Sequence, residues 1–275
     1  MKKKGFTLAE LIGVVVLLGA ILLIIIPAVS RNLKEGKQKL YNDQIEGIKQ
    51  SLQLWANDNK PGNNETYYLT LSQLKQQGLV EHDIKNPNTK EYLANDMVLK
   101  VVNKNDIIDY EVLDETGTCK SDYIDIPKME NNNNIIYVEI NSFYNDTLVT
   151  AKDIDGNILN NVTSEGNVDI TKLGSYYITY NITKDNKCNS TIRNVIVTDT
   201  VGPVISFKND LEISLSQINT FDLLSDVTVT DNSGIEPTVE VTNNFASIKG
   251  NYTVKYVATD SSGNVTTKLR KVTVK

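Results

Sequence analysis

The side chains that most often carry chemistry are scarce in this chain of 275 residues. It has one histidine and two cysteines, whereas a zinc site built from these residue types needs three or four ligands. Carboxylates are abundant, but spacing singles out no pair of them, and there is no phosphate-binding loop or dinucleotide fingerprint. We therefore predict that the protein is not an enzyme and that it has no cofactor and no metal ion.

One acidic stretch has some features of a calcium loop. Asp153-Ile154-Asp155-Gly156-Asn157 lacks the third acidic position and the downstream bidentate glutamate of an EF-hand. A hairpin turn explains it better, because Asp-Gly and Gly-Asn favour turn conformations. We interpret Asp260-Ser261-Ser262-Gly263-Asn264 as a turn as well.

The charge balance narrows the class of partner. Lys and Arg number 28 and Asp and Glu number 34, which gives a formal net charge of −6. A nucleic-acid surface needs clustered positive charge, so we predict no nucleic-acid partner.

The first 30 residues differ from the rest of the chain. Three lysines stand at positions 2–4, and residues 11–29 contain no polar side chain. As a helix this run of 19 residues is ~28 Å long, about the thickness of the hydrocarbon core of a bilayer. We expect it to be a membrane segment.

The residues around this run resemble a known processing signal. Lys2-Lys3-Lys4-Gly5-Phe6-Thr7-Leu8-Ala9-Glu10 is similar to the prepilin signal of type IV pilins and type II secretion pseudopilins. The resemblance implies that a prepilin peptidase cuts between Gly5 and Phe6 and that the new amine of Phe6 is N-methylated. It also implies that Glu10 sets the register between neighbouring subunits, since an unpaired charge in an apolar helical core is costly.

Two helix residues would give this segment flexibility. Pro27 removes one helix hydrogen bond and matches the position of a kinking proline in many pilins, while Gly19 weakens its own turn. The alternative for Gly19, and for Gly13, is close helix–helix packing.

A secretory signal cut after Ala28-Val29-Ser30 is the competing interpretation. Its apolar run would exceed the usual ~7–15 residues, and Glu10 would have no purpose in it. Positive charge on both sides of the run leaves the orientation nearly undecided. The resemblance implies that the N-terminus is cytoplasmic and the remainder extracellular.

Beyond the membrane segment we expect an α+β domain. Apolar residues at helical spacing, ending with Trp55, predict a helix to about residue 59, and Trp55 should be in its core. Thr70 or Ser72 can cap a short helix that Gly78 ends. Residues 97–102 and 107–113 predict a β-hairpin. A long helix packed on a small antiparallel sheet resembles the plan of a pilin ectodomain.

After Pro127 and four consecutive asparagines the helical period disappears, and the sequence predicts all-β sandwiches. Residues 174–180 resemble 250–256, and 193–197 resemble 270–274, which indicates two tandem copies of one module. Both copies resemble bacterial Ig-like surface domains, the second more clearly. The expected strands are 135–140, 146–151, 168–170, 175–182, 190–197, 204–207, 211–215, 227–230, 238–242, 252–259 and 266–274.

The module pattern implies a place for Cys188 at the turn between the last two strands of the first copy, near the point where the chain enters it after Cys119. A Cys119–Cys188 disulfide would then connect two domains of an exported protein. Two free thiols are the alternative.

These observations predict four segments. Residues 1–29 are a prepilin signal and transmembrane helix, 30–126 a pilin-like α+β domain, and 127–199 and 200–275 two Ig-like β-sandwiches. The resemblance implies a structural subunit of a type IV pilus or pseudopilus, in a minor, tip or adhesive role. Expected partners are the prepilin peptidase, other pilin subunits, the membrane and a surface receptor. Two alternatives remain open: an Ig-like adhesin that is anchored or secreted without filament assembly, and a pseudopilin of a secretion or DNA-uptake system.

Overall fold

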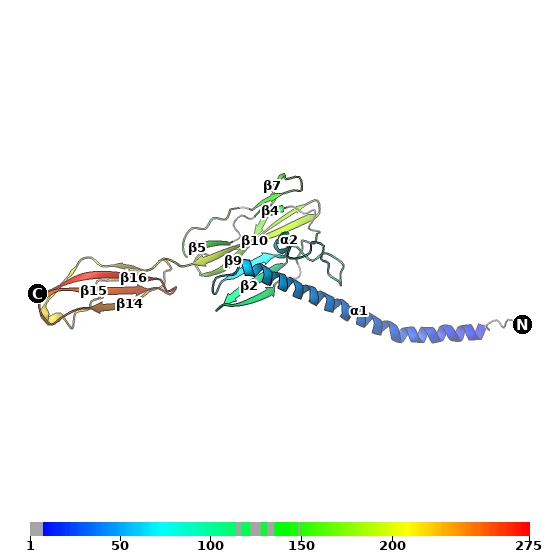
Figure 1. Cartoon of the computed structure of the whole chain (residues 1–275), viewed down its shortest axis with the longest axis horizontal. Coiled ribbons are helices and arrows are strands. Elements are labelled where there is room, and N and C mark those ends of the chain that lie inside the picture. Colours follow the sequence, from blue (N-terminus) through cyan, green and yellow to red (C-terminus); the bar gives the residue numbers. More distant parts are fainter. Residues whose placement is uncertain (1–7, 114–116, 122–127, 131–134, 148) are drawn as a thin grey trace. The chain divides into compact units, whose positions relative to one another are not determined.

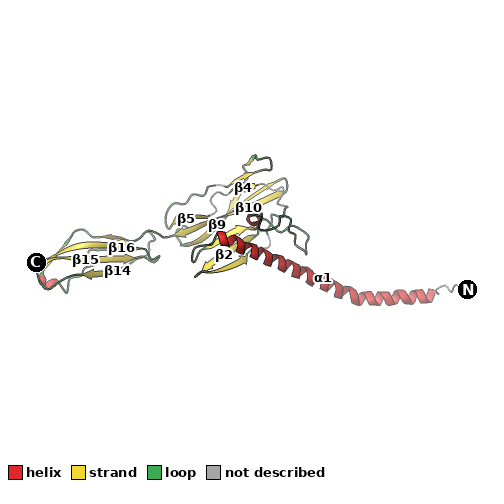
Figure 2. Cartoon of the chain, in the orientation of Figure 1, coloured by secondary structure: helices red, strands yellow, loops and turns green. Residues whose placement is uncertain are grey.

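The computed structural model of the chain describes residues 8–113, 117–121, 128–130, 135–147 and 149–275 (Figures 1 and 2). It divides into two compact units. Unit 1 consists of Met1–Asn132, Leu148–Glu165 and Thr179–Ile192. Unit 2 consists of Asn133–Thr147, Gly166–Ile178 and Arg193–Lys275.

Helix α1 (Leu8–Asp58) runs for 51 residues without interruption, with Pro27 inside it (Figure 1). Its N-terminal part is apolar enough and long enough to cross a membrane, and none of that apolar stretch is buried inside the protein. The expected helix therefore forms as one continuous element. By length and composition α1 can serve as a membrane segment.

The C-terminal third of α1 is packed inside unit 1. Its buried residues recur every three or four positions, so they lie along one face that contacts β2, β3 and α2. The prediction that Trp55 is a core residue is confirmed. The buried residues of this face are Tyr41, Ile45, Ile48, Leu52, Trp55 and Ala56.

A small antiparallel sheet lies in unit 1, with the order β1-β2-β3. Its strands are β1 (Thr66–Thr70), β2 (Val98–Lys104) and β3 (Ile107–Val112). The predicted hairpin is confirmed: Asn105 and Asp106 form its turn with positive φ. Strand β1 was not predicted, because its last residue, Thr70, is also the cap that signals the start of a helix.

Helix α2 (Leu71–Gln76) begins at the predicted cap. The Thr70 side chain accepts a hydrogen bond from the Gln73 amide, and the Gln73 side chain accepts one from the Thr70 amide. This reciprocal capping box fixes the junction between β1 and α2. Gly78 follows at φ +71°, a conformation that favours glycine, and the helix ends before it.

The first β-rich region contains two sheets. Strands β4 (Lys128–Glu130), β6 (Thr150–Lys152) and β7 (Ile158–Leu159) form one, in the order β4-β6-β7. The other has the order β5-β10-β9-β8. Its strands are β5 (Ile135–Glu139), β8 (Thr163–Glu165), β9 (Gly174–Lys184) and β10 (Lys187–Thr198), and β5 pairs with β10 in parallel.

The second β-rich region repeats this order. Strands β12 (Leu211–Ile213), β14 (Thr238–Asn243), β15 (Gly250–Thr259) and β16 (Val265–Val274) form a sheet with the order β12-β16-β15-β14. Strand β12 pairs with β16 in parallel. Strands β11 (Val204–Ser206) and β13 (Thr228–Thr230) form a second, two-stranded sheet, and a 3-10 helix covers Leu215–Gln217.

Apolar residues of both sheets meet in one core in this second region. Val254, Tyr256, Ala258, Val272 and Val274 come from β15 and β16, and Ile205 and Ile213 come from β11 and β12. The alternating pattern along β15 and β16 puts these side chains on one face of the four-stranded sheet.

The predicted strand at 168–170 is wrong, and in the predicted strand 146–151 residues 146, 147 and 149 lie outside β6, which begins at Thr150. Residues 168–170 are not a strand, because the Asp169 carboxylate accepts hydrogen bonds from the amide and hydroxyl of Thr171 and closes a local turn. Strands β4, β7 and β8, which have two or three residues each, were not predicted.

Candidate functional site

Some residues of the proposed prepilin signal lie outside the part of the chain that the structure describes. This holds for Gly5 and Phe6, whereas Glu10 is exposed in the first turn of α1. A Cβ added at Gly19 would meet no atom within 4 Å, and the same holds at Gly13. The surface of α1 at both glycines is therefore open to a neighbouring helix.

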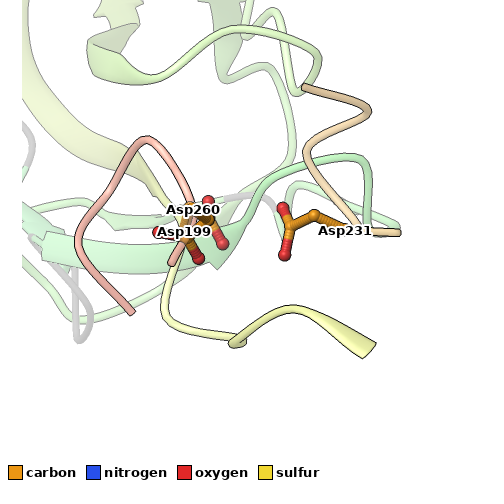
Figure 3. Close-up of side chains that lie close together, drawn as sticks. All are labelled: Asp199, Asp231 and Asp260. Atoms are coloured by element: carbon orange, nitrogen blue, oxygen red, sulfur yellow. The ribbon is translucent and has the colours of Figure 1, made fainter. Parts of the chain in front are cut away.

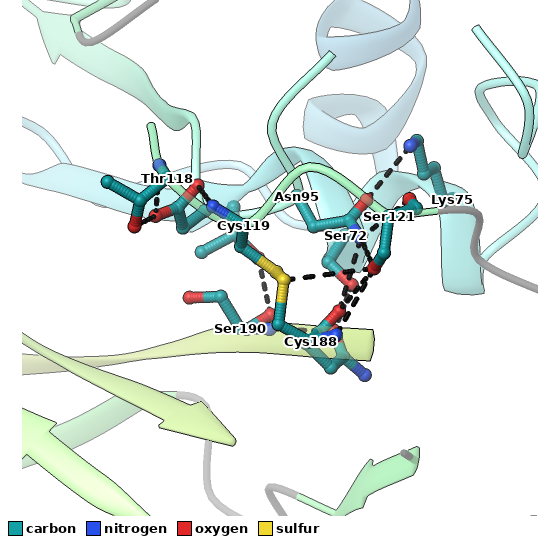
Figure 4. Close-up of a disulfide and its surroundings, with 11 residues drawn as sticks. Ser72, Lys75, Asn95, Thr118, Cys119, Ser121, Cys188 and Ser190 are labelled. Carbon is teal, nitrogen blue, oxygen red and sulfur yellow. Dashed lines mark hydrogen bonds between the residues drawn. A yellow bond between two sulfur atoms is a disulfide. The ribbon is translucent and has the colours of Figure 1, made fainter. Parts of the chain in front are cut away.

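The two cysteines form one disulfide, and both lie in unit 1 (Figure 4). Cys119 follows the β2–β3 hairpin and Cys188 is the second residue of β10. Their Cα atoms are 5.5 Å apart, inside the usual range for a disulfide. The bridge connects the segment after the helix-and-sheet region to a strand of the first β-rich region.

Buried polar groups surround this bridge. The Asn95 amide nitrogen donates to the Cys119 carbonyl at 2.7 Å, and the Asn95 side chain donates to the Cys188 carbonyl at 3.3 Å. The Ser121 hydroxyl also donates to the Cys188 carbonyl, at 3.0 Å. Since Asn95 is fully buried, this network holds both half-cystines in a defined arrangement.

A second connection runs from the start of α2 to β10. The Thr70 hydroxyl donates to the Ser190 carbonyl at 2.8 Å, and the Ile192 amide donates to the Gln73 side chain at 3.0 Å. Ser72 also contacts Asn189. Strand β10 is thus connected to the segment around Cys119 by a disulfide and to the start of α2 by buried hydrogen bonds, so its attachment within unit 1 resists separation.

Each β-rich region has a buried arginine paired with an aspartate. Arg193 donates to Asp146 at 2.6 Å, and Arg270 donates to both oxygens of Asp226 at 2.6 Å. Both arginines stand at matching places in the sequence repeat. Tyr180 and Tyr256, which also match, are both fully buried, so the repeat extends to equivalent core positions.

Three aspartates that no sequence motif groups come together in unit 2 (Figure 3). Asp199 follows β10, Asp231 follows β13, and Asp260 begins the turn between β15 and β16. One carboxylate oxygen from each lies within 4.8 Å of those from the other two. We call Asp199, Asp231 and Asp260 the aspartate cluster.

Local hydrogen bonds hold two members of the cluster in place. The Asp260 carboxylate accepts from the amides of Ser262 and Asn264 at 2.9 and 2.8 Å. The Asp231 carboxylate accepts from the Ser233 amide at 2.9 Å. These are aspartate-initiated turns, and their side chains reach the cluster because β13, β15 and β16 bring the turns together.

Among the three, the carboxylate of Asp199 has the least favourable electrostatic environment. The residue is 7% exposed, and one carboxylate oxygen, Oδ2, accepts a hydrogen bond from the Ser262 hydroxyl at 2.9 Å. The other oxygen, Oδ1, is buried and has no hydrogen-bond partner. Burial raises the pKa of Asp199, and the nearby charges of Asp231, Asp260 and Glu139 raise it further.

A comparison with curated proteins gives no match. Among solved structures, the M60 catalytic domain with CBM51 domains of Clostridium perfringens ZmpB is 12% identical, with a TM-score of 0.35, over 65% of this chain and 33% of that one. The chain thus spans a third of the length of that structure.

Two further structures are similar over about half of this chain. The lipoprotein BT2262 of Bacteroides thetaiotaomicron is 14% identical over 54% of this chain and 80% of its own, with a TM-score of 0.25. Human mucin-like protocadherin EC1-2 is 11% identical over 54% of this chain and 98% of its own, with a TM-score of 0.26.

One protein-family model matches part of the chain. It covers residues 130–197. These residues belong to the first copy of the repeat, whereas the second copy carries the clearer sequence resemblance to Ig-like domains. An apolar N-terminal helix together with a bacterial Ig-like surface module fits a membrane-anchored protein with an extracellular region. Residues 130–197 are therefore similar to the bacterial surface protein Ig-like domain, and this similarity indicates a surface-exposed protein.

Proposed function

We propose that this chain is a structural subunit of a type IV pilus or pseudopilus that displays Ig-like modules at the cell surface. One observation carries the proposal: α1 is a single helix with an uncovered apolar N-terminal part and a C-terminal third packed inside unit 1. A helix that served only as a discarded signal would not need to continue into a folded domain.

The uncovered part of α1 is suited to two apolar environments. Its side chains from Leu11 to Val29 can contact lipid before assembly and neighbouring helices after it. Because lipid tails are as apolar as these side chains, transfer between the two depends on close packing. The open surfaces at Gly13 and Gly19 allow such close approach.

Within this proposal Glu10 sets the axial register. An acidic side chain among apolar residues is costly in a membrane or a helical core, and an amine on a neighbouring subunit offsets this cost. The amine of a cleaved Phe6 would be that partner. Processing between Gly5 and Phe6, by a prepilin peptidase, is therefore part of the proposal.

The size of the β-rich regions favours a minor subunit. Residues 127–275 make up more than half of the chain, and a bulky addition is easier to accommodate at a filament tip than along its shaft. We infer an adhesive role from the match to a surface Ig-like module, with a surface receptor as the partner.

The surface-adhesin alternative shares the Ig-like match but uses α1 only as an anchor or signal. A pseudopilin of a secretion or DNA-uptake system shares the helix but differs in the assembly that it joins. The N-terminal residue of the mature protein separates the adhesin from both filament proteins.

The test is peptide mass spectrometry of the mature protein from a bacterium with a prepilin peptidase and from a matched strain without it. An N-methylated Phe6 that depends on the peptidase is the expected result. A start near Arg31 would identify a secreted protein instead, and an intact Met1 in both strains would identify a membrane anchor.

Assembly is tested with two glutamate variants of α1. Glu10→Ala should be cleaved yet absent from sheared filaments, because it removes the register charge. Glu35→Ala is the control: Glu35 lies on the same helix beyond the apolar run and pairs with exposed Arg31 at 3.8 Å. Equal incorporation of both variants would refute the role of Glu10.

A further inference from the structure

The aspartate cluster lacks a compensating positive charge. Among the residues that the structure describes, Asp199, Asp231 and Asp260 form no ion pair with a lysine or arginine. A fourth carboxylate, Glu139 of β5, is near enough to Asp199 to raise its pKa. The Asn232 side chain and the Thr200 amide and hydroxyl donate to Glu139, so its own charge is already satisfied.

A turn of the same kind as that of residues 260–264 occurs at residues 153–157, but its aspartate has a different neighbour. Asp153 and Asn157 make the hydrogen bonds that Asp260 and Asn264 make, from the amide and from the side chain of the asparagine. The fourth residue of each turn is a glycine at positive φ, Gly156 or Gly263. At Asp153 the Lys184 ammonium donates a hydrogen bond to the carboxylate oxygen Oδ2 at 2.7 Å.

Beside Asp260 lie two carboxylates, whereas beside Asp153 lies an ammonium. Asp199 and Asp231 each bring a buried oxygen with no hydrogen-bond partner: Oδ1 of Asp199 and Oδ2 of Asp231. A buried carboxylate oxygen without a partner is expensive. Two such atoms beside a third carboxylate indicate that a cation binds between them.

The spacing suits one metal ion. Calcium binds oxygen ligands at about 2.3–2.6 Å, so two ligands of the same ion lie at most about 5 Å apart. The three aspartate oxygens lie within 4.8 Å of one another. Calcium also accepts irregular geometry and several further ligands, such as carbonyls and waters, whereas magnesium requires a near-ideal octahedron.

We propose that Asp199, Asp231 and Asp260 bind one calcium ion. The ion replaces the missing ammonium of this turn and joins three segments: the exit of β10, the end of β13 and the turn between β15 and β16. Asp199 lies where the chain leaves one copy of the repeat and enters the next, so the ion fixes that point of unit 2 to two loops of the second copy. This binding site is independent of the filament proposal, and it departs from our sequence-based expectation of no metal ion.

The test uses the full chain in detergent micelles, stripped with EDTA and titrated calorimetrically with CaCl₂. We expect one calcium ion per chain with a dissociation constant of about 10⁻⁴–10⁻³ M, the range of extracellular modules. Asp199→Asn should weaken binding at least tenfold. The matched control is Asp153→Asn, which alters the same kind of turn outside the cluster and should leave binding unchanged.

A local readout keeps the proposal testable if Asp199→Asn folds poorly. Hydrogen exchange of the unaltered protein should slow at residues 199–203 and 231–234 in CaCl₂ compared with EDTA. Asp231→Asn, in a less buried turn, is the second variant and should remove this protection. The absence of calcium binding, an equal loss in Asp153→Asn, or equal or tighter binding of MgCl₂ would overturn the proposal.

Discussion

Removal of the Cys119–Cys188 disulfide should loosen unit 1 while the second copy of the repeat stays unchanged. The bridge closes a loop with a sequence separation of 69 residues. In the loop-entropy model a loop of this length stabilises the folded state by ~4 kcal/mol at 25 °C. Asn95, which bonds to the carbonyls of both half-cystines, and Ser121, which bonds to the carbonyl of Cys188, would lose the fixed positions of their partners in addition.

The perturbation is the double variant Cys119→Ala/Cys188→Ala, and hydrogen exchange measured by mass spectrometry is the assay. A chain with two compact units does not unfold in one step, so a signal resolved by segment is needed. A loss of ~4 kcal/mol corresponds to roughly 10³-fold faster exchange in β1 and β2, wherever opening separates the two linked segments. Exchange in β15 and β16 should not change.

Two controls separate the crosslink from the packing of its atoms. Cys119→Ala alone should match the double variant, because either change opens the loop. The unaltered protein treated with a reducing agent should show the same acceleration. A change of less than tenfold in β1 and β2 would refute the entropy argument, and equal acceleration in β15 would show that the bridge acts beyond unit 1.

Three further predictions concern the Arg270–Asp226 ion pair, Tyr144 and Pro27. Asp226→Asn leaves the buried guanidinium of Arg270, which is 1% exposed, without its charge partner. We expect a loss of about 2 kcal/mol, less than for a fully buried pair because the Asp226 side chain is 39% exposed, measured by exchange in β16. The hydrogen bonds and charge of Arg270 hold the pKa of Asp226 below its usual range, so this stability is present at neutral pH and is lost as the pH falls below about 4. Burial, together with the hydrogen bond to Asp146 and its charge, raises the pKa of Tyr144 to about 12. Because the folded state favours the neutral phenol, this contribution to the free energy of unfolding is complete below pH ~10 and disappears as the pH rises to 12. Tyr144→Phe should abolish this pH dependence, measured as the free energy of unfolding at a series of pH values. Pro27→Ala restores a helix hydrogen bond and should slow amide exchange around residue 27 in micelles, by up to the ~3 kcal/mol that an interior proline costs; unchanged exchange would contradict a weak point there.

Long periodic elements of this fold are readable from the sequence. The apolar run and the spacing up to Trp55 predict α1, and the structure confirms it as one helix. The matching segments around Tyr180 and Tyr256 predict a repeated module, and both residues are buried at equivalent places in sheets of the same order. Such signals extend over many residues, so local choices reinforce one another.

Short elements are not readable in this way. Strand β8 has three residues that are all exposed, and no alternation marks it. At 168–170 the apolar residues resemble a strand, but the hydrogen bonds of Asp169 decide for a turn. The sequence left the pairing of Cys119 and Cys188 open, since the bridge depends on a segment after β3 reaching the first residues of β10.

The amino-acid sequence alone predicts the apolar helix, the repeat and the turns that begin at Asp153 and Asp260. It identified the turn that begins at Asp260 from local residue preferences, which act over only a few positions. The tertiary structure alone decided that Asp199, Asp231 and Asp260 converge. Their turns are about 30 residues apart in the chain, and only the pairing of the strands between them brings three like charges within one ion's reach.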